Sequence, residues 1–244
     1  HYLYSVDNIM FVKPSCPIPL EIIVKGYIDD NTYTSIWTNY REGTKEYSKN
    51  KRLDKPIVLA NVKDKKNVFI SPLEIIEKNI ITFLEWEIIS KTAIKLYEHG
   101  EEEAAKKGLI LVNTKYEFGF DENDNIVLIN DVHTCDSSRY WKLESYKTRF
   151  VNGFNPENYD KDIVKYWIKE NLHKDSKIPE KLINDTSIVY SKFYKKLTEN
   201  TVEEYTYFDF GTTNFNIHLD TEQYLREITN KFCPLYTDQI GCKP

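Results

Sequence analysis

The chain lacks several features that would assign it to a class at once. None of its apolar stretches approaches the roughly 20 residues that a transmembrane helix needs, and no signal-peptide pattern is present. Lysine and arginine (33) do not outnumber aspartate and glutamate (38), so the surface is not suited to coating a nucleic acid. No Gly-x-Ser-x-Gly motif supports a serine hydrolase. We therefore expect neither a membrane nor a nucleic-acid partner.

Cysteine is also scarce and irregularly spaced. The four cysteines form no C-x-x-C pair and no evident disulfide framework. This usage predicts a reducing, cytoplasmic location. What is present is ordinary for a globular protein: 244 residues with 41% hydrophobic and 29% charged side chains, enough for one large domain or two small ones. The chain has no internal repeat.

Periodicity and capping signals predict the main elements. Short strands are expected at 9–13 and 20–25, and the polar stretch 32–68 is interpreted as an irregular, solvated loop. Ser71-Pro-Leu-Glu74 has the composition of a capping box and begins a helix. A long helix is expected over 83–107, closed by Gly108, with its buried side at Leu84, Ile88, Ile89, Ala93, Leu96 and Tyr97.

Beyond the hairpin, we expect the region from about residue 160 to 200 to be mostly helical. One helix is expected at 160–171 and another from Pro179, with Val189, Phe193 and Leu197 at four-residue spacing. The tail 201–244 could hold a strand at 205–210 and a helix at 221–231.

A polar hairpin is the most informative feature. The run 109–120 places Asn113, Lys115 and Glu117 on one side, and Val112, Thr114, Tyr116 and Phe118 on the other. A turn at 121–125 leads into a second strand that begins at Ile126. A plain structural strand would have apolar side chains where this one has charges and amides.

The register of this hairpin predicts a cation site. If Phe120 pairs with Ile126, then Glu117 lies opposite Ile129, Lys115 opposite Asp131 and Asn113 opposite His133. Glu117 and Asp131 are then diagonal neighbours about 7 Å apart, a gap that a divalent cation could bridge through oxygen ligands. A one-residue slip would send Asp131 to the other face.

Three ordered segments resemble the SAICAR synthetase family of purine biosynthesis. They are Ile18-Pro-Leu-Glu-Ile-Ile-Val-Lys-Gly-Tyr27, Leu109-Ile-Leu-Val-Asn-Thr-Lys-Tyr-Glu-Phe-Gly119 and Asp131-Val-His-Thr-Cys-Asp-Ser-Ser-Arg-Tyr-Trp141. The resemblance runs over about residues 1–200. It implies an ATP-dependent ligase that joins L-aspartate to carboxyaminoimidazole ribonucleotide, with Mg²⁺ on the polyphosphate.

The resemblance also implies roles for particular residues. Catalysis would involve Lys115, Glu117 and Asp131, and the last two would hold the metal. Substrate contacts would come from Lys25, Asn113, Lys115, Ser138 and Arg139. ATP would lie beside Lys13, Pro17, Glu21, Lys63, Glu117 and Asp131.

Departures from the family pattern cluster at this site. Asn113 and Asn130 stand where the family has acidic residues, Lys25 replaces an arginine, and Asp30-Asn31 replaces Gly-Ser. The family's glycine-containing N-terminal lobe is expected to be missing. Two alternatives therefore stay open: a non-catalytic nucleotide-binding or interaction module on the same fold, and a hairpin domain that binds only a divalent metal.

These observations predict an α+β protein, a two-layer fold with a mixed, mainly antiparallel sheet packed with helices. We expect residues 1–31 to be the end of an N-terminal connector region, 32–200 to be the catalytic core and 201–244 to be an extension of unknown role. The expected partners are the small-molecule substrates, and a homo-oligomer stays open.

Overall fold

The fold is built on one antiparallel sheet. The computed structural model describes residues 2–6, 9–29, 48–63, 68–130, 132–159, 164, 167–168, 170–171 and 178–199. The six-stranded sheet has the order β5-β4-β3-β6-β7, and β8 also pairs with β6. Its strands are β3 (Cys16–Tyr27), β4 (Arg52–Val62), β5 (Phe69–Ile70), β6 (Leu109–Phe120), β7 (Ile126–Leu128) and β8 (Ser138–Lys142). The α+β prediction is confirmed, and every pairing among these strands is antiparallel rather than mixed.

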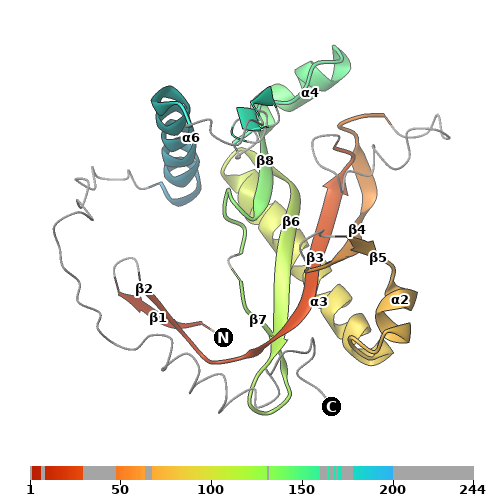
Figure 1. Ribbon diagram of the computed structural model, residues 1–244. Coiled ribbons are helices and arrows are strands. Elements are labelled where there is room, and N and C mark those ends of the chain that lie inside the picture. Colours follow the sequence, from red (N-terminus) through yellow and green to blue (C-terminus); the bar gives the residue numbers. More distant parts are fainter. Residues whose placement is uncertain are drawn as a thin grey trace.

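The long helix α3 (Phe83–Lys106) covers one face of this sheet (Figure 1). Thr82 and Glu85 form a capping box at its start, which fixes where the helix begins. Ile89, Ala93 and Tyr97, spaced four residues apart, are fully buried against the sheet. The helix was predicted correctly in type and length.

The first turns of α3 differ from the prediction. Leu84 and Ile88 were expected to be buried, but they are 68% and 43% exposed. Trp86 is buried in their place. The stripe that meets the sheet therefore begins at Trp86 and continues through Ile89, because the side of the helix that carries Leu84 and Ile88 faces away from the core.

Strand β4 overturns the prediction of an irregular loop over 32–68 at residues 52–62, whereas 32–47 and 64–67 lie outside the described residues. Its eleven residues pair along β3, with Leu20 opposite Val62 and Lys25 opposite Ile57. The segment is half-buried and carries Pro56 within it, so its periodicity is weak in the sequence. This segment forms a strand because it pairs with β3 along its length.

Three helices complete the described part of the fold. α2 (Pro72–Glu77) begins with the predicted capping box between Ser71 and Glu74. α4 (Leu143–Val151) follows β8 directly. α6 (Glu180–Thr198) confirms the helix predicted from Pro179, and its Phe193 packs on Tyr140 with ring centroids 4.7 Å apart. The expected helix at 160–171 lies mostly outside the described residues, and the elements expected within 201–244 lie outside them entirely.

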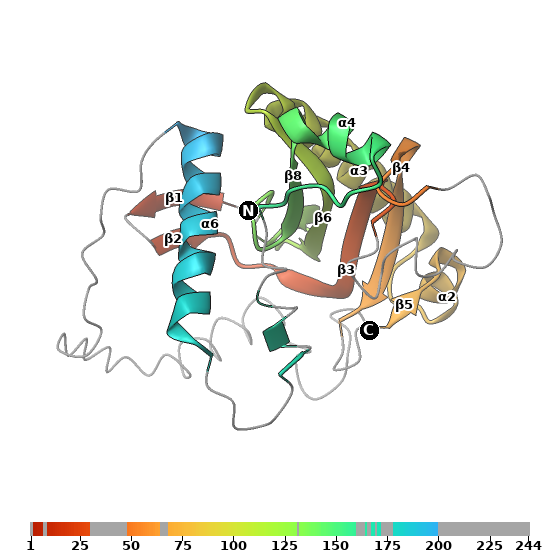
Figure 2. The same cartoon turned by 90° about the horizontal axis from the view of Figure 1, so that it is seen from above.

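The N-terminal hairpin forms a separate two-stranded sheet. It consists of β1 (Tyr2–Val6) and β2 (Ile9–Val12), which Figure 2 shows set apart from the main sheet. The chain then enters β3, which pairs with β4 on one side and β6 on the other. Residues before and after position 31 thus share one sheet, and the three proposed domain boundaries stay a prediction. None of the helices in the described ranges has the length and apolar character of a membrane span.

A bulge in β6 divides that strand between two partners. Its end pairs with β7, whereas its beginning pairs with β8 and shows a register shift between Leu111 and Asn113. The extra residue, Val112, packs with Ile110 and Trp141, apart from the core that holds Tyr116 and Phe118. The strict alternation predicted from Val112 onward is therefore wrong at Val112 and correct from Asn113 onward.

Candidate active site

The sheet face opposite α3 carries the polar side chains that the sequence singled out. Antiparallel pairing puts Lys25 opposite Asn113 and Glu21 opposite Glu117, so all four point to this face. The other face is apolar, with Ile22, Val24 and Tyr116 in the core under α3. The polar face has two parts: a carboxylate row at one level of the strands and a cation cluster four residues away along β6.

The carboxylate row consists of Asn61, Glu21 and Glu117 on β4, β3 and β6. Asn61 pairs with Glu21, and Glu21 pairs with Glu117. Two carboxylates directly opposite each other repel. The arrangement is stable here because cations lie beside both of them.

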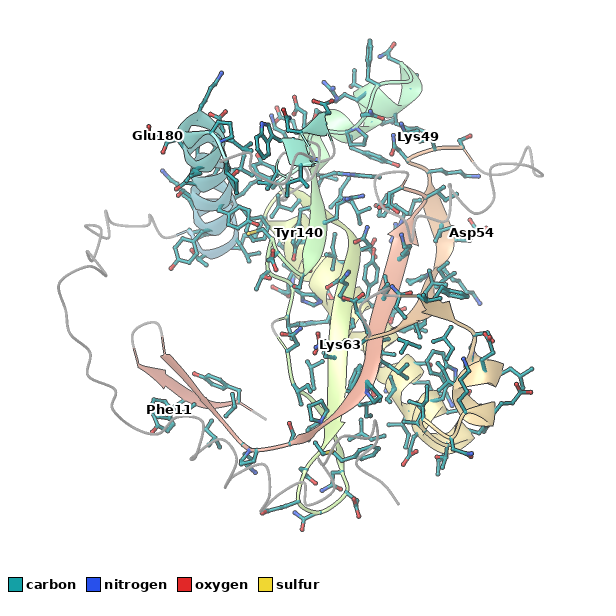
Figure 3. The ribbon with its side chains drawn as sticks, in the orientation of Figure 1. Phe11, Lys49, Asp54, Lys63, Tyr140 and Glu180 are labelled. Atoms are coloured by element: carbon teal, nitrogen blue, oxygen red, sulfur yellow. The ribbon has the colours of Figure 1, made fainter. Side chains whose placement is uncertain are left out.

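A lysine binds each carboxylate of the row. Lys115 Nζ donates to Glu21 Oε1 at 2.7 Å, and Lys63 Nζ donates to Glu117 Oε2 at 2.5 Å. Figure 3 shows Lys63 beside β3 and β6 on this face. Asn130 Nδ2 also donates to Glu117 Oε1 at 2.9 Å. Both lysines are about half exposed (55% and 41%), whereas both glutamates are 16% exposed, so the ammonium groups can reach a ligand.

Some buried polar atoms of the row have no hydrogen-bond partner. They are Glu21 Oε2 and both side-chain polar atoms of Asn61. Asn61 is fully buried, and an unpaired buried amide costs about 1–3 kcal/mol. These atoms are therefore open to a hydrogen bond from a water, an ion or a ligand. Asn61 was missed by the sequence analysis because β4 was not predicted.

The cation cluster is centred on Asp29. Lys25 Nζ donates to Asp29 Oδ1 at 3.0 Å, Asn113 Nδ2 donates to Oδ2 at 2.9 Å, and Arg139 Nη1 also donates to Oδ2. Lys25, Asp29 and Arg139 are all buried, at 0%, 0% and 3% exposure. Burial lowers the pKa of Lys25, and the carboxylate of Asp29 opposes that shift.

Asp29 was not among the site residues predicted from the sequence. The signal that could have revealed it is its even spacing from Lys25, because residues four apart in an extended segment share a face. Lys25, Asn113 and Arg139, which the resemblance implied as substrate contacts, lie together around Asp29. Ser138 lies on the other face, where its hydroxyl contacts that of Thr114 at 2.7 Å.

The remaining predicted residues are more peripheral. Lys13 is exposed and precedes β3, near Asp121 of the hairpin turn. Pro17 is exposed and pairs with Gly119, at the end of β3 beyond Glu21. Asp131 lies outside the described residues, so the proposed Glu117–Asp131 pair stays a prediction. Among the residues that are described, no three His, Cys, Asp or Glu side chains come together as a metal site.

The hairpin register was predicted correctly only near its turn. Phe120 pairs with Ile126, and Ile129 N donates to Glu117 O at 3.0 Å, as expected. Farther along, Lys115 N donates to Ser137 O, and Asn113 pairs with Arg139 rather than His133. The prediction failed there because β8 replaces β7 as the partner of β6.

His133 has a structural environment. Its imidazole contacts the Tyr116 hydroxyl at 2.6 Å, and its backbone oxygen accepts from Tyr140. Burial lowers its pKa to about 4. It packs on α3 at Gly100, where a Cβ would lie 2.2 Å from the ring. These contacts place His133 between β6 and α3.

A cavity of about 640 Å³ also lies away from the polar face. It is lined by residues at the C-terminal ends of α3 and α6, including Lys106, Lys107 and Lys196. Lys106 pairs with Glu103, and Lys107 pairs with Glu199. These are solvated ion pairs, so we place the candidate site on the sheet face.

The fold and this polar face together define an α+β protein in which lysines and carboxylates converge on one face of an antiparallel sheet. Residues 1–182 match the family model described as SAICAR synthetase, and the chain belongs to this family. The family prediction is thereby confirmed.

Similar proteins agree with this membership. A phosphoribosylaminoimidazole-succinocarboxamide synthase of Legionella pneumophila (strain Paris) is 38% identical over 214 residues, 81% of this chain and 69% of the relative. The chloroplastic synthase of Arabidopsis thaliana is 37% identical over 80% of this chain and 51% of its own length. The SAICAR synthase of Saccharomyces cerevisiae complexed with SAICAR is similar in structure, with a TM-score of 0.66 and 30% identity over 80% of this chain and 64% of that one. The chain thus spans about half to two thirds of the length of these relatives.

Proposed function

We propose that this chain catalyses, or forms the core of an enzyme that catalyses, the ATP-dependent joining of L-aspartate to carboxyaminoimidazole ribonucleotide. The observation that carries the proposal is the carboxylate row with its two half-exposed lysines, Lys63 and Lys115, on the open sheet face. The similar SAICAR synthase of Saccharomyces cerevisiae is a complex with SAICAR, which supports the same compound as a ligand here.

The residues present fit a metal-bound nucleotide. Glu21 and Glu117 offer carboxylate oxygens at one level, which is the donor type that Mg²⁺ prefers. The unpaired atoms of Glu21 and Asn61 offer hydrogen bonds to a ligand beside them. Glu117 and Asp131 would hold the metal, and the bound nucleotide would supply the phosphoryl group that activates the substrate carboxylate.

The chain's own residues then position the reactants. Lys63 and Lys115 can turn from the glutamates toward anionic oxygens and hold them. Lys25 and Arg139 would bind the anionic part of the ribonucleotide, and Arg139 offers a planar fork for it. Lys13 and Pro17 would lie beside the adenine. Most of the catalytic effect would come from orientation and charge stabilisation.

Turnover is tested with the full chain by measuring ADP release. The expected result is release that requires both L-aspartate and the imidazole ribonucleotide, and that is lost in Lys115→Met. Lys91→Met is the matched control, because Lys91 makes a similar lysine–glutamate pair of 2.6 Å with Glu87 on exposed α3. Absence of turnover in the wild-type chain, with ATP still bound, contradicts the ligase.

One observation favours a second candidate, a non-catalytic nucleotide-binding module. Asn113 carries no charge where the family pattern has an acid, and Asp29 already binds both Lys25 and Arg139. Such a module would bind ATP without consuming it. Binding of Mg²⁺ alone, with no affinity for ATP, would instead indicate a metal-binding hairpin.

Location and assembly are also proposals. We place the protein in the cytoplasm, where purine nucleotides are made, and cell fractionation tests this. Light scattering on the purified chain tests whether it forms a homo-oligomer.

A further inference from the structure

The carboxylate of Asp29 is surrounded by hydrogen-bond donors in the way that a bound anionic ligand would be. Its two carboxylate oxygens accept from three side chains: Lys25 on β3, Asn113 on β6 and Arg139 on β8. The carboxylate itself is fully buried. Three strands thus direct donors toward one internal anion.

The donors have the chemistry of an oxyanion subsite. An ammonium, a guanidinium and an amide converge on one point, and such sets bind phosphate or carboxylate groups through charge-assisted hydrogen bonds. Two buried cations are costly unless an anion lies between them. In this chain the anion is supplied by Asp29, two residues beyond the end of β3.

A ligand phosphate would need these same donors. Lys25 is 1% exposed at its side chain and Arg139 is 4% exposed, so neither is accessible while Asp29 holds them. Any dianion that approached would also meet the negative charge of Asp29.

We propose that Asp29 is a built-in occupant of an oxyanion subsite, and that a phosphate group binds Lys25, Asn113 and Arg139 only by displacing it. This deepens the proposed function and rests on it, because the subsite belongs to the same sheet face. Asp29 then weakens the binding of a phosphate group at this subsite relative to a chain with a neutral residue at this position.

The test measures binding of inorganic phosphate by titration calorimetry at fixed ionic strength. Asp29→Asn keeps the shape and removes the charge, whereas Asp29→Ala also opens space. Both should bind phosphate at least about tenfold more tightly than the wild type, because close charge pairs have couplings of that size or larger. Asp54→Asn, an exposed change on β4, should leave the affinity unchanged.

Two further arms show that the gain arises at this subsite. Adding Lys25→Met to Asp29→Ala should abolish the gain. The affinity for acetate, which carries one charge, should rise less in the Asp29 variants than the affinity for phosphate does, if the subsite favours a phosphate group. An equal gain for acetate would contradict the phosphate preference.

A folding control covers the case in which a variant of Asp29 does not fold. If either variant fails to fold in chloride, we compare its refolding yield in phosphate with that in chloride, and we measure the same two yields for Asp54→Asn. Recovery in phosphate alone supports the proposal. Folded variants with wild-type phosphate affinity, or variants that phosphate does not rescue, overturn it.

The outcome is independent of turnover. Variants that gain phosphate affinity support Asp29 as the occupant even if the wild-type chain releases no ADP, which would count only against the ligase. A wild-type chain that turns over, with no gain in the variants, would retain the ligase and reject this inference.

Discussion

Glu21 on β3 and Glu117 on β6 lie directly opposite each other, and each is bound by a lysine that reaches it from a different level of the sheet. Lys115 lies two residues before Glu117 on β6 and binds Glu21 diagonally. Lys63 follows β4 and reaches across β3 to Glu117. Since like charges in this geometry repel, the lysines are part of what holds the row together. If an anionic ligand draws a lysine away from its glutamate, that carboxylate needs another positive charge beside it. A divalent cation bound with the ligand would provide this charge.

Replacing Glu117 by Gln should therefore abolish magnesium-dependent ATP binding. The amide keeps the shape but loses the charge that pairs with Lys63 and would pair with the metal. We expect ATP affinity in the presence of Mg²⁺ to fall by at least about tenfold, or 1.4 kcal/mol. Titration calorimetry with and without Mg²⁺ measures this. Glu122→Gln, exposed in the hairpin turn, is the control, and unchanged binding in Glu117→Gln would refute the assignment.

Gly26→Ala should destabilise the fold without touching the polar face. A Cβ at Gly26 would lie 2.0 Å from the Tyr97 hydroxyl, which donates to Leu111 O at 2.6 Å. We expect a loss of about 2–3 kcal/mol in the free energy of unfolding, measured with urea. Part of that loss should disappear in a Tyr97→Phe background, because the clashing oxygen is gone.

The control for this change is Gly153→Ala. Gly153 has a φ of +73° and no atom within 4 Å of an added Cβ, so only backbone strain of about 1 kcal/mol is expected. Equal losses at the two glycines would contradict the close contact with Tyr97.

His133 should make the protein less stable in mild acid. Burial lowers its pKa to about 4, whereas the unfolded chain takes up the proton near pH 6.5. Between these values only the unfolded state is protonated, so stability falls as pH drops from about 7 to 4, by up to about 3 kcal/mol. Urea unfolding across this range should give a flatter profile for His133→Gln. His99→Gln, exposed on α3, should keep most of the wild-type slope.

Thr82→Ala should remove the cap of α3. The Thr82 hydroxyl accepts from Glu85 N at 3.3 Å, and the Glu85 carboxylate accepts from Thr82 N at 2.7 Å. Loss of the hydroxyl should cost about 1 kcal/mol of stability, read from thermal or urea unfolding. Thr82→Ser should restore nearly all of it, and a failure of serine to do so would point to lost packing instead.

The elements that were predicted correctly are those whose signals are local. The capping box at Ser71, the later part of the α3 stripe and the turn at 121–125 each depend on residues within a few positions of one another. The pairing of Phe120 with Ile126 follows from that turn.

The features that were missed depend on distant partners. β4 becomes a strand because β3 offers an edge, and the bulge at Val112 is visible only when β8 pairs with β6. The burial of Asp29 likewise requires Arg139, which is 110 residues away along the chain. No local pattern encodes such contacts, so the sequence named the donors of the cation cluster without the acceptor they share.

Strand β6 also sets a fixed spacing across the candidate site. Asn113 stands in the cation cluster and Glu117 in the carboxylate row, four positions apart on one continuous strand. At about 3.4 Å per residue this places the two regions about 14 Å apart. Lys115 lies at the midpoint, about 7 Å from each. β6 therefore fixes the distance between the two regions. If one ligand bound at the cation cluster and another at the carboxylate row, the ends of the two ligands that face each other would meet over Lys115.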